Sequence, residues 1–378
     1  MIWRLTPALL VVLLSLTSCP PRASIANTEM KPSAPVKKQS EPGHIKNVIL
    51  MIGDGMGITQ VTAGLYSNSN HLELERCRYI GLLKSYSANK LTTDSAAGAT
   101  AFACGKKTYN GAIGVDTNKQ PIPTLLELAE QRDMATGLVV TSTICHATPA
   151  AFIAHVEKRS MYEDIATFFA GSGVDLFIGG GEKHFIKRKD GRNLVKSLVD
   201  KGYAIGRIQD TKIADLSFSP DRPMGYFTGF DDPKTYRQGR RYFVPAVEKS
   251  LTYLKARGGD KGFFLMIEGS QIDWGGHAND SKYIIEEMLD FDRAIGKVLD
   301  FAQADGETLV VITADHETGG YAILPSSSLN DLHAKFATDY HTPDLIPVYA
   351  YGPKADLFSG IYENTAIFDK IKEALGWE

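Results

Sequence analysis

The amino-acid sequence predicts an α/β protein with a mostly parallel central sheet flanked by helices. Two observations support this fold class. From about residue 46 onward, short apolar runs of strand length alternate with longer amphipathic segments. Charged and polar residues follow directly after several of those apolar runs, as they do where the strands of an open α/β sheet end beside a ligand. With 378 residues, 43% of them hydrophobic, the chain can bury a large core, and we expect a single domain over 46–378.

The first 45 residues have a different composition. Residues 1–18 contain one basic residue and an apolar stretch that is too short to cross a bilayer as a permanent helix, which is typical of a secretory signal. The sequence Leu-Thr-Ser-Cys at 16–19 resembles a bacterial lipobox. We therefore expect a lipoprotein signal peptide at 1–18 and a lipid anchor on Cys19, in the periplasm or at the cell surface. A plain signal peptide that ends near a cysteine is the alternative. Residues 19–45, rich in Pro, Ser and Lys, predict a flexible tether.

Within the predicted domain, apolar runs indicate strands at 47–53, 136–142, 174–180, 262–269, 308–314 and 346–351. Apolar residues at helical spacing indicate helices at 123–132, 161–171, 191–201, 241–256, 281–303 and 364–375. A further helix of small residues follows Asp94, which caps it well, as Thr93 also could. Residues 206–240 are polar and rich in Gly and Pro, and we interpret them as an insertion over the sheet.

Charge and cysteine content exclude some functions. The net charge of −3 and the lack of a dense basic run give no reason to expect nucleic acid as a partner. If Cys19 carries lipid, Cys77, Cys104 and Cys145 remain. An odd number cannot be fully paired, and their spacing matches no zinc module. We expect Cys104 to be buried inside the helix of small residues.

Acids and histidines gather where the predicted strands end. Such ends can converge on one site. Gly275 and Gly276 disfavour a helix between Asp273 and His277, so we expect a tight loop there. The residues concerned are Asp54, Glu268, Asp273, His277, Asp315, His316 and His341.

Carboxylates and imidazoles are typical zinc ligands, and seven of them exceed the four that one tetrahedral zinc takes. They indicate two or three ions. Two ions about 4 Å apart can hold the attacking and leaving oxygens of a phosphoryl transfer. Ser95 follows a capping residue at a helix N-terminus, where anions bind readily. It is therefore predicted to be the nucleophile, deprotonated by a metal ion.

Six sequence blocks carry a family resemblance. In order they read VILMIGDGMG, TTDSAAGATAFACGKKTYNGAIGV, HATPAAFIAHV, EGSQIDWGGHAND, ADHETGG and HTPDLIPVYAYG. Together they resemble the bacterial alkaline phosphatases, and they span residues 47 to about 353. The resemblance implies an alkaline phosphatase-like catalytic domain that hydrolyses small phosphate monoesters to an alcohol and inorganic phosphate. It also implies broad specificity, a covalent phosphoserine and a requirement for two Zn²⁺ and one Mg²⁺.

The same resemblance implies a role for individual residues. The first zinc, which holds the leaving oxygen and later activates water, is expected on Asp273, His277 and His341. The second zinc, which binds the Ser95 oxygen, is expected on Asp54, Asp315 and His316. Magnesium is expected on Asp54, Thr148 and Glu268. Arg159 matches the arginine that clamps the phosphate. Asp94, His146 and Trp274 are expected to act indirectly, either by contacting the ligand residues or through a water molecule.

Two departures from the family pattern stand out. Trp274 occupies a position where other members have Lys or His, which puts the dependence on Mg²⁺ in doubt. Only residues 317–340 separate the ADHE block from His341, too few for the crown-like lobe of larger members, so the usual homodimer stays an open expectation.

Other activities share the scaffold or the residues. A sulfatase needs a Pro two residues after its nucleophile, whereas Ser95 is followed by Ala-Ala-Gly. A phosphodiesterase commonly uses Thr and lacks counterparts of Glu268 and Arg159. A protein that binds phosphate or metal without turnover would have lost a ligand or the serine. A metal-dependent acyl hydrolase fits the zinc ligands but not three metal sites.

Overall fold

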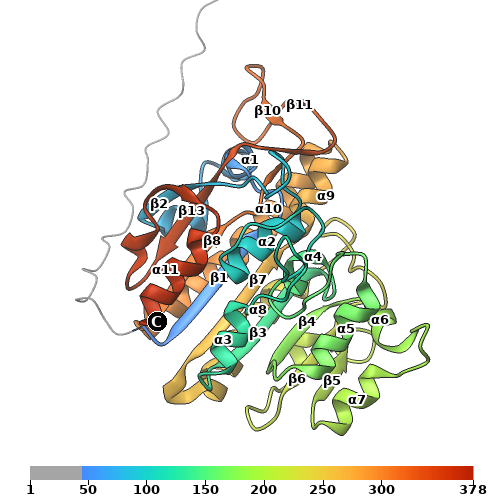
Figure 1. Cartoon of the computed structure of the whole chain (residues 1–378). Coiled ribbons are helices and arrows are strands. Elements are labelled where there is room, and N and C mark those ends of the chain that lie inside the picture. Colours follow the sequence, from blue (N-terminus) through green and yellow to red (C-terminus); the bar gives the residue numbers. More distant parts are fainter. Residues whose placement is uncertain (1–44, 378) are drawn as a thin grey trace, which may run out of the picture. The chain divides into compact units, whose positions relative to one another are not determined.

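Ten strands form one sheet in the computed structural model of the protein, which describes residues 45–377 (Figure 1). Their order across the sheet is β14-β2-β13-β8-β1-β7-β3-β4-β6-β5. Among these strands, β13 alone runs antiparallel to its neighbours. The predicted, mostly parallel sheet is confirmed. The strands are β1 (Asn47–Gly53), β2 (Tyr79–Lys84), β3 (Ala135–Thr143), β4 (Leu176–Gly180), β5 (Ala204–Arg207), β6 (Met224–Phe227), β7 (Phe263–Gly269), β8 (Thr308–Thr313), β13 (Leu345–Tyr351) and β14 (Gly360–Glu363).

Helices cover both faces of this sheet. In Figure 1, α2, α3, α4 and α11 lie in front of it, whereas α8 and α10 lie behind. All six predicted helices are present, and their ends differ from the predicted ones by at most three residues. The helices are α1 (Ile58–Ser67), α2 (Ser95–Cys104), α3 (Leu125–Glu130), α4 (Ala147–Ala150), α5 (Tyr162–Gly171), α6 (Lys183–Ile186), α7 (Leu194–Asp200), α8 (Phe243–Gly258), α9 (Gln271–His277), α10 (Ser281–Asp305) and α11 (Ala366–Leu375). Four short 3₁₀ helices are η1 (Glu73–Arg76), η2 (Ile213–Asp215), η3 (Gly259–Lys261) and η4 (Ala355–Phe358).

The interpretation of residues 206–240 as an insertion over the sheet is wrong. β6 lies inside that segment, pairs with β4 and β5, and extends the sheet to its edge. β5 and β6 have only four residues each, too few for a periodic signal. Gly225 on β6 is needed for packing, because a Cβ there would lie 2.2 Å from the ring of Phe177 on β4.

The loop predicted between Asp273 and His277 is also wrong, because these residues lie on helix α9. The two glycines that argued against a helix instead let it pack closely. A Cβ on Gly275 would lie 2.8 Å from the backbone nitrogen of Ile284 on α10. A Cβ on Gly276 would lie 2.7 Å from the side chain of Thr318. Packing outweighs the cost of about 1 kcal/mol that glycine carries in a helix.

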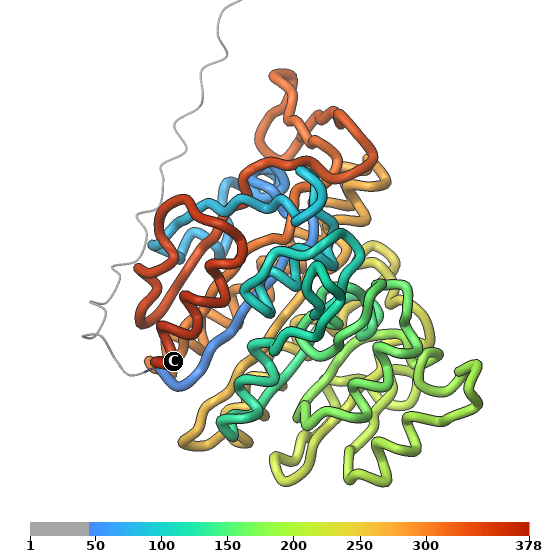
Figure 2. Tube along the Cα trace, in the orientation of Figure 1, coloured from blue at the N-terminus to red at the C-terminus, as the bar shows by residue number. Residues whose placement is uncertain are grey.

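The segment that follows β8 is short and carries two small strand pairs. β9 (Glu317–Thr318) pairs with β12 (His341–Thr342), and β10 (Tyr321–Ile323) pairs with β11 (Ala334–Phe336). Figure 2 shows this chain segment at the same end of the domain as α9. Residues 317–340 therefore form no large lobe, which agrees with the expectation from their number.

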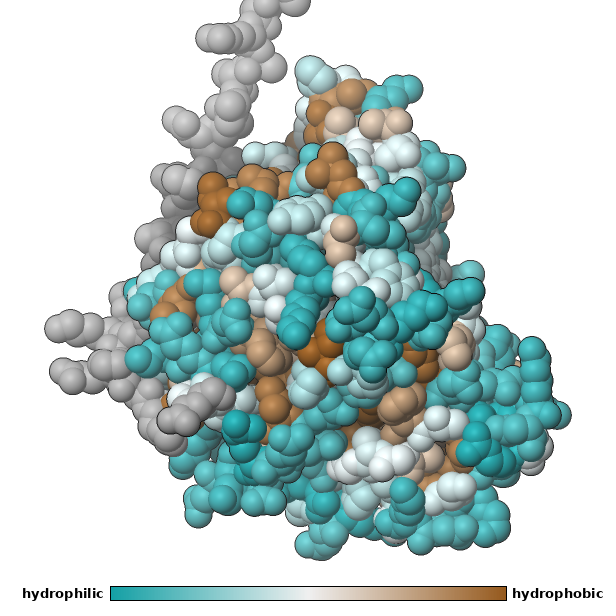
Figure 3. Space-filling view, viewed as in Figure 1, coloured by the Kyte–Doolittle hydropathy of each residue, from teal (hydrophilic) through white to brown (hydrophobic). Residues whose placement is uncertain are grey.

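Strands β1, β7 and β8 are entirely buried, as expected for the centre of a sheet covered on both faces. The face shown in Figure 3 is mostly hydrophilic, with apolar side chains in small groups. All three cysteines of the described part are buried and unpaired, so the burial predicted for Cys104 is confirmed. Across residues 45–377, no helix has both the length and the apolar character that a membrane span requires. The predicted signal peptide, Cys19 and nearly all of the tether lie outside the described residues.

Candidate active site

Ser95 is the first residue of α2, and Asp94 caps this helix. One Asp94 carboxylate oxygen accepts hydrogen bonds from the backbone nitrogens of Ala97 and Gly111, both at 3.0 Å. Every residue of α2 is buried. The small side chains allow this, since a Cβ on Gly98 would already lie 3.0 Å from Asp315. The predicted cap thus fixes Ser95 at the end of a helix that packs directly against the acidic loop after β8.

The first group of ligand-type side chains is Asp273, His277 and His341, whose offered atoms all lie within 4.8 Å of one another. The two histidines face each other through their Nε2 atoms at 3.1 Å. Their Nδ1 atoms contact backbone carbonyl oxygens instead, that of Asp339 at 2.6 Å and that of Thr93 at 2.9 Å. Both imidazoles therefore direct the same nitrogen toward Asp273, to which the distances are 3.4 and 3.5 Å.

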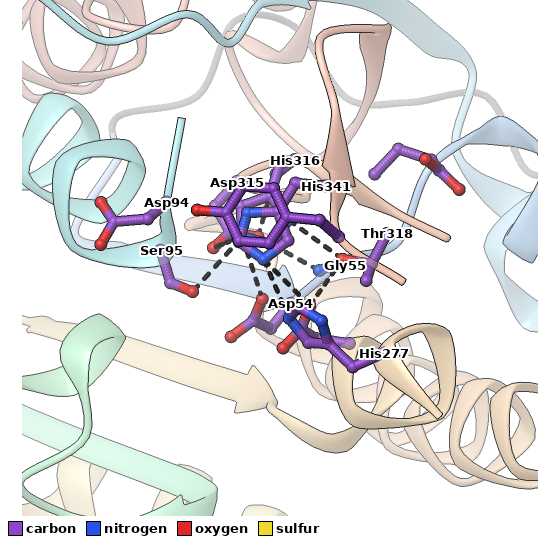
Figure 4. Close-up of polar contacts among 12 residues, drawn as sticks. Asp54, Gly55, Asp94, Ser95, His277, Asp315, His316, Thr318 and His341 are labelled. Carbon is purple, nitrogen blue, oxygen red and sulfur yellow. Dashed lines mark hydrogen bonds and ion pairs between the residues drawn. The ribbon is translucent and has the colours of Figure 1, made fainter. Parts of the chain in front are cut away.

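The second group is Asp54, Asp315 and His316 (Figure 4). All three side chains are fully buried. His316 Nε2 lies 3.2 Å from Asp315 Oδ2, 3.5 Å from Asp54 Oδ1 and 3.3 Å from Ser95 Oγ. The other Asp315 oxygen accepts hydrogen bonds from the backbone nitrogens of Gly55 and His316. Backbone amides thus hold the carboxylate while its second oxygen faces the group.

The third group is Asp54, His146 and Glu268. Asp54 belongs to two groups because it follows β1, between the ends of β7 and β8. Ser270 donates a 2.7 Å hydrogen bond to Glu268 Oε2. Thr148, two residues after His146 on α4, is fully buried, and its hydroxyl has no hydrogen-bond partner among residues 45–377.

The buried carboxylates lack partners in a way that fits bound cations. Within residues 45–377, both Asp54 oxygens, Glu268 Oε1 and Asp315 Oδ2 are buried without a hydrogen bond. An unpaired buried carboxylate is costly unless a cation compensates it. Burial raises the pKa of Asp54 well above its ordinary value, with Asp315 as the next cause. Burial likewise raises the pKa of Asp315, and that of Glu268 to about 7.

His316 of the second group and His146 of the third group are held neutral, the form in which imidazole binds metal. Burial lowers the pKa of His316 well below its ordinary value. Burial, followed by the nearby charge of Arg159, lowers the pKa of His146 to about 3. Oxygen and imidazole donors of this kind suit divalent ions such as Zn²⁺ and Mg²⁺.

Arg159 stands beside the serine at the edge of an open cleft with a volume of about 300 Å³. Its guanidinium lies 3.3 Å from Asp94 Oδ2 and 3.4 Å from His146 Nε2. It sits in a turn, and its backbone nitrogen donates to the carbonyl of Gly111. The cleft is lined by Asp94, Ser95, His146, Arg159, Asp273, Trp274, His277, Tyr340 and His341.

The structure thus brings all the site residues that were predicted from the sequence to one end of the sheet, within or beside these three groups. It also places two residues there that the sequence reasoning missed. Tyr340 stacks on His341 with ring centroids 4.4 Å apart and lines the cleft. Thr318 contacts Asp273 and His316. The sequence signal that could have identified them is their position, because each stands one or two residues from a predicted ligand.

Fold and site together indicate an α/β enzyme whose carboxylates and imidazoles can hold metal ions, and comparison with known proteins specifies the family. A sequence model of the alkaline phosphatase family matches residues 45–337. Alkaline phosphatase 3 of Bacillus subtilis is 33% identical, with 91% of this chain and 92% of that protein covered. Streptomycin-6-phosphate phosphatase of Streptomyces griseus is 34% identical, with 90% of this chain and 92% of that protein covered.

Among solved structures, the alkaline phosphatase of the Antarctic bacterium TAB5 aligns with a TM-score of 0.83 and 40% identity, covering 89% of this chain and 100% of that one. A variant of the TAB5 enzyme with one histidine replaced by glutamate has Mg bound in its M3 site. The chain described here belongs to the alkaline phosphatase family. It is a phosphomonoesterase of the short form, without a large crown.

Proposed function

We propose that the chain hydrolyses phosphate monoesters of broad structure through a covalent phosphoserine on Ser95. The observation that carries this proposal is the position of the Ser95 hydroxyl. It stands at the N-terminus of a buried helix, 3.3 Å from His316 and beside a cluster of carboxylates whose oxygens lack partners. A phosphate group bound there would meet the helix N-terminus, the Arg159 guanidinium and the ions that the carboxylates hold.

Three ions are assigned to the three groups. Asp273, His277 and His341 would hold one Zn²⁺, and Asp54, Asp315 and His316 would hold the other. Asp54, Glu268 and Thr148 would hold Mg²⁺, with His146 at its edge. When bound, such ions lower the pKa of a coordinated hydroxyl or water and neutralise negative charge on phosphate oxygens.

The remaining steps belong to the chain's own residues. Arg159 binds two non-bridging phosphate oxygens, a pairing that its planar guanidinium allows and a lysine does not. Asp94 holds Arg159 and, through the helix cap, Ser95, so that clamp and nucleophile keep a fixed separation. The Ser95 oxygen bonds to phosphorus as the ester P–O bond breaks and the alcohol leaves. Water then cleaves the phosphoserine, releases phosphate and restores Ser95.

A serine esterase with His316 as its base is the alternative that the geometry raises. In such a site one imidazole nitrogen faces the serine while the other faces the acid. Here the same nitrogen, Nε2, faces Ser95, Asp315 and Asp54 at 3.2 to 3.5 Å. A nucleophile, two carboxylates and one imidazole nitrogen that converge on one point are suited to surround a cation, so we favour the metal-dependent phosphatase.

Hydrolysis of p-nitrophenyl phosphate by the wild type and Ser95→Ala tests the proposal. The wild type should turn over, lose activity in EDTA and regain it with Zn²⁺ and Mg²⁺, and Ser95→Ala should be near silent. A panel of alkyl, sugar and aryl monoesters tests breadth. If the metal-loaded wild type cleaves only a diester, a sulfate ester or a carboxylic ester, the chemistry is assigned wrongly. Inertness toward all of them favours a binding protein.

We also propose export. Residues 1–18 would act as a lipoprotein signal peptide, Cys19 would carry the lipid, and 19–45 would tether the catalytic domain of 46–378 to a membrane. The support is the Leu-Thr-Ser-Cys sequence at 16–19 and the composition of the segment after it. The mass of the mature N-terminal peptide from membrane extracts decides, since an unmodified Cys19 would contradict the anchor.

A further inference from the structure

The imidazoles of the two predicted zinc sites are oriented by their outer nitrogens. The Nδ1 atoms of His277 and His341 each contact a backbone carbonyl oxygen. The Nδ1 of His316 instead contacts a side-chain hydroxyl, that of Thr318, at 3.2 Å. A side-chain partner is one that a substitution can remove, so His316 offers a test that the other two histidines do not.

The Thr318 hydroxyl has a second contact, to the other predicted zinc site. It donates a 2.5 Å hydrogen bond to Asp273 Oδ1. Its single proton is committed to that carboxylate, because an ionised carboxylate cannot donate. Toward His316 the hydroxyl oxygen must therefore accept, which requires the proton of the neutral imidazole to be on Nδ1. Nε2, the nitrogen that faces Asp54 and Asp315, is then free to bind a metal.

The fold fixes Thr318 firmly between these two ligands. It is fully buried and lies opposite His341 in the β9–β12 pair. Two glycines give it room. A Cβ on Gly55 would lie 2.7 Å from the Thr318 hydroxyl oxygen, and a Cβ on Gly276 would lie 2.7 Å from its Cβ. Gly55 also has a φ of +73°, which favours glycine independently.

We propose that Thr318 is a positioning residue that sets the tautomer of His316 and the orientation of Asp273, and so links the zinc affinities of the two sites. The proposal rests on the metal assignment given under the proposed function. Removing the hydroxyl leaves an imidazole without its outer partner and frees one carboxylate oxygen. Loss of such an outer partner typically lowers metal affinity about 10- to 100-fold.

The experiment is a zinc titration of the metal-free full chain in competition with a chromophoric chelator. It compares the wild type with Thr318→Val, which keeps the shape, and Thr318→Ser, which keeps the hydroxyl. Thr342→Val is the matched control, because this threonine lies on the paired strand and its hydroxyl donates to Glu317 and not to a proposed ligand. We expect about 10- to 100-fold weaker zinc binding at both sites for Thr318→Val, and wild-type binding for Thr318→Ser and Thr342→Val.

Several results would overturn the inference. They are wild-type zinc affinity in Thr318→Val, weakening at one site only, or a Ser variant as weak as the Val variant, which would assign the effect to packing. A wild type that binds no zinc overturns the metal assignment itself, so the two failures are distinct. If Thr318→Val does not fold, ¹⁵N-histidine NMR of the metal-free wild type decides, because there no ion fixes the tautomer of His316. The proposal requires the proton of His316 on Nδ1, and a proton on Nε2 would overturn it.

Discussion

Glu268 predicts how the stability of the metal-free protein depends on pH. Its side chain is fully buried, one oxygen accepts from Ser270, and the other has no hydrogen-bond partner among residues 45–377. Burial raises its pKa from 4.5 to about 7 in the folded state. At pH values below 4.5 the carboxyl is protonated whether the chain is folded or unfolded. Between pH 4.5 and 7 the unfolded chain loses this proton first, so the folded state loses stability as pH rises.

The magnitude follows from the size of the shift. A shift of about 2.5 pKa units corresponds to about 3 kcal/mol, reached with a slope of at most about 1.4 kcal/mol per pH unit. Glu268→Gln keeps the shape of the side chain and removes this titration. In EDTA, the variant should therefore lose about 3 kcal/mol less than the wild type between pH 4.5 and 7.5. Asp54 and Asp315 titrate in both proteins, and loss of the Glu268 charge, one cause of the raised pKa of Asp54, changes the variant in the same direction.

Urea unfolding in EDTA at several pH values between 4.5 and 7.5 measures the effect, with Glu373→Gln at an exposed position of α11 as the control. With Zn²⁺ and Mg²⁺ present, the wild type should no longer lose this stability, because bound cations compensate the carboxylates. Parallel stability curves for the wild type and Glu268→Gln in EDTA would refute the reasoning.

Three further predictions concern the clamp, the packing of α9 and the thiols. Arg159→Lys should lower kcat/KM for p-nitrophenyl phosphate about 10- to 100-fold, because one charged hydrogen bond of about 1.5–3 kcal/mol is lost. An unchanged kcat/KM would show that Arg159 does not bind the phosphate. Gly276→Ala should lower the thermal midpoint, because its Cβ would press on Thr318, whereas Gly171→Ala, with open space around it, should not; equal midpoints would contradict the close packing. A thiol reagent should react slowly with the native domain and fully after unfolding, and rapid labelling of the folded domain would contradict the burial of Cys77, Cys104 and Cys145.

The central strands and long helices could be predicted because their signals are local. β1, β7 and β8 are continuous apolar runs, and α10 carries a long apolar stripe. The edge strand β5 and its neighbour β6 have four residues each and are recognised only by their pairing. α9 was missed for another reason. The two glycines in it are unfavourable locally, and only the approach of Ile284 and Thr318 explains them.

Most of the site was predictable because nearly all of its predicted residues belong to a sequence block, and Arg159 closely follows the block HATPAAFIAHV. Asp54 and Asp315 follow β1 and β8, Glu268 lies at the end of β7, and the parallel order of β8, β1 and β7 brings these strand ends together. Thr318 belongs to the ADHETGG block but is not a zinc-ligand residue type, and Tyr340 lies outside the blocks, so neither was found in this way. A threonine or tyrosine beside a ligand carries no signal of its own, and its contact depends on how β9 pairs with β12 across the site.

The covalent phosphoserine on Ser95 is the central claim, and its most direct test is the stereochemical course at phosphorus. A phosphate monoester made chiral with oxygen isotopes is transferred by the metal-loaded wild type to an acceptor alcohol, and the product configuration is determined. Two in-line displacements, one by Ser95 and one by the acceptor, predict retention. Inversion would mean a single displacement without a phosphoserine and would contradict the account.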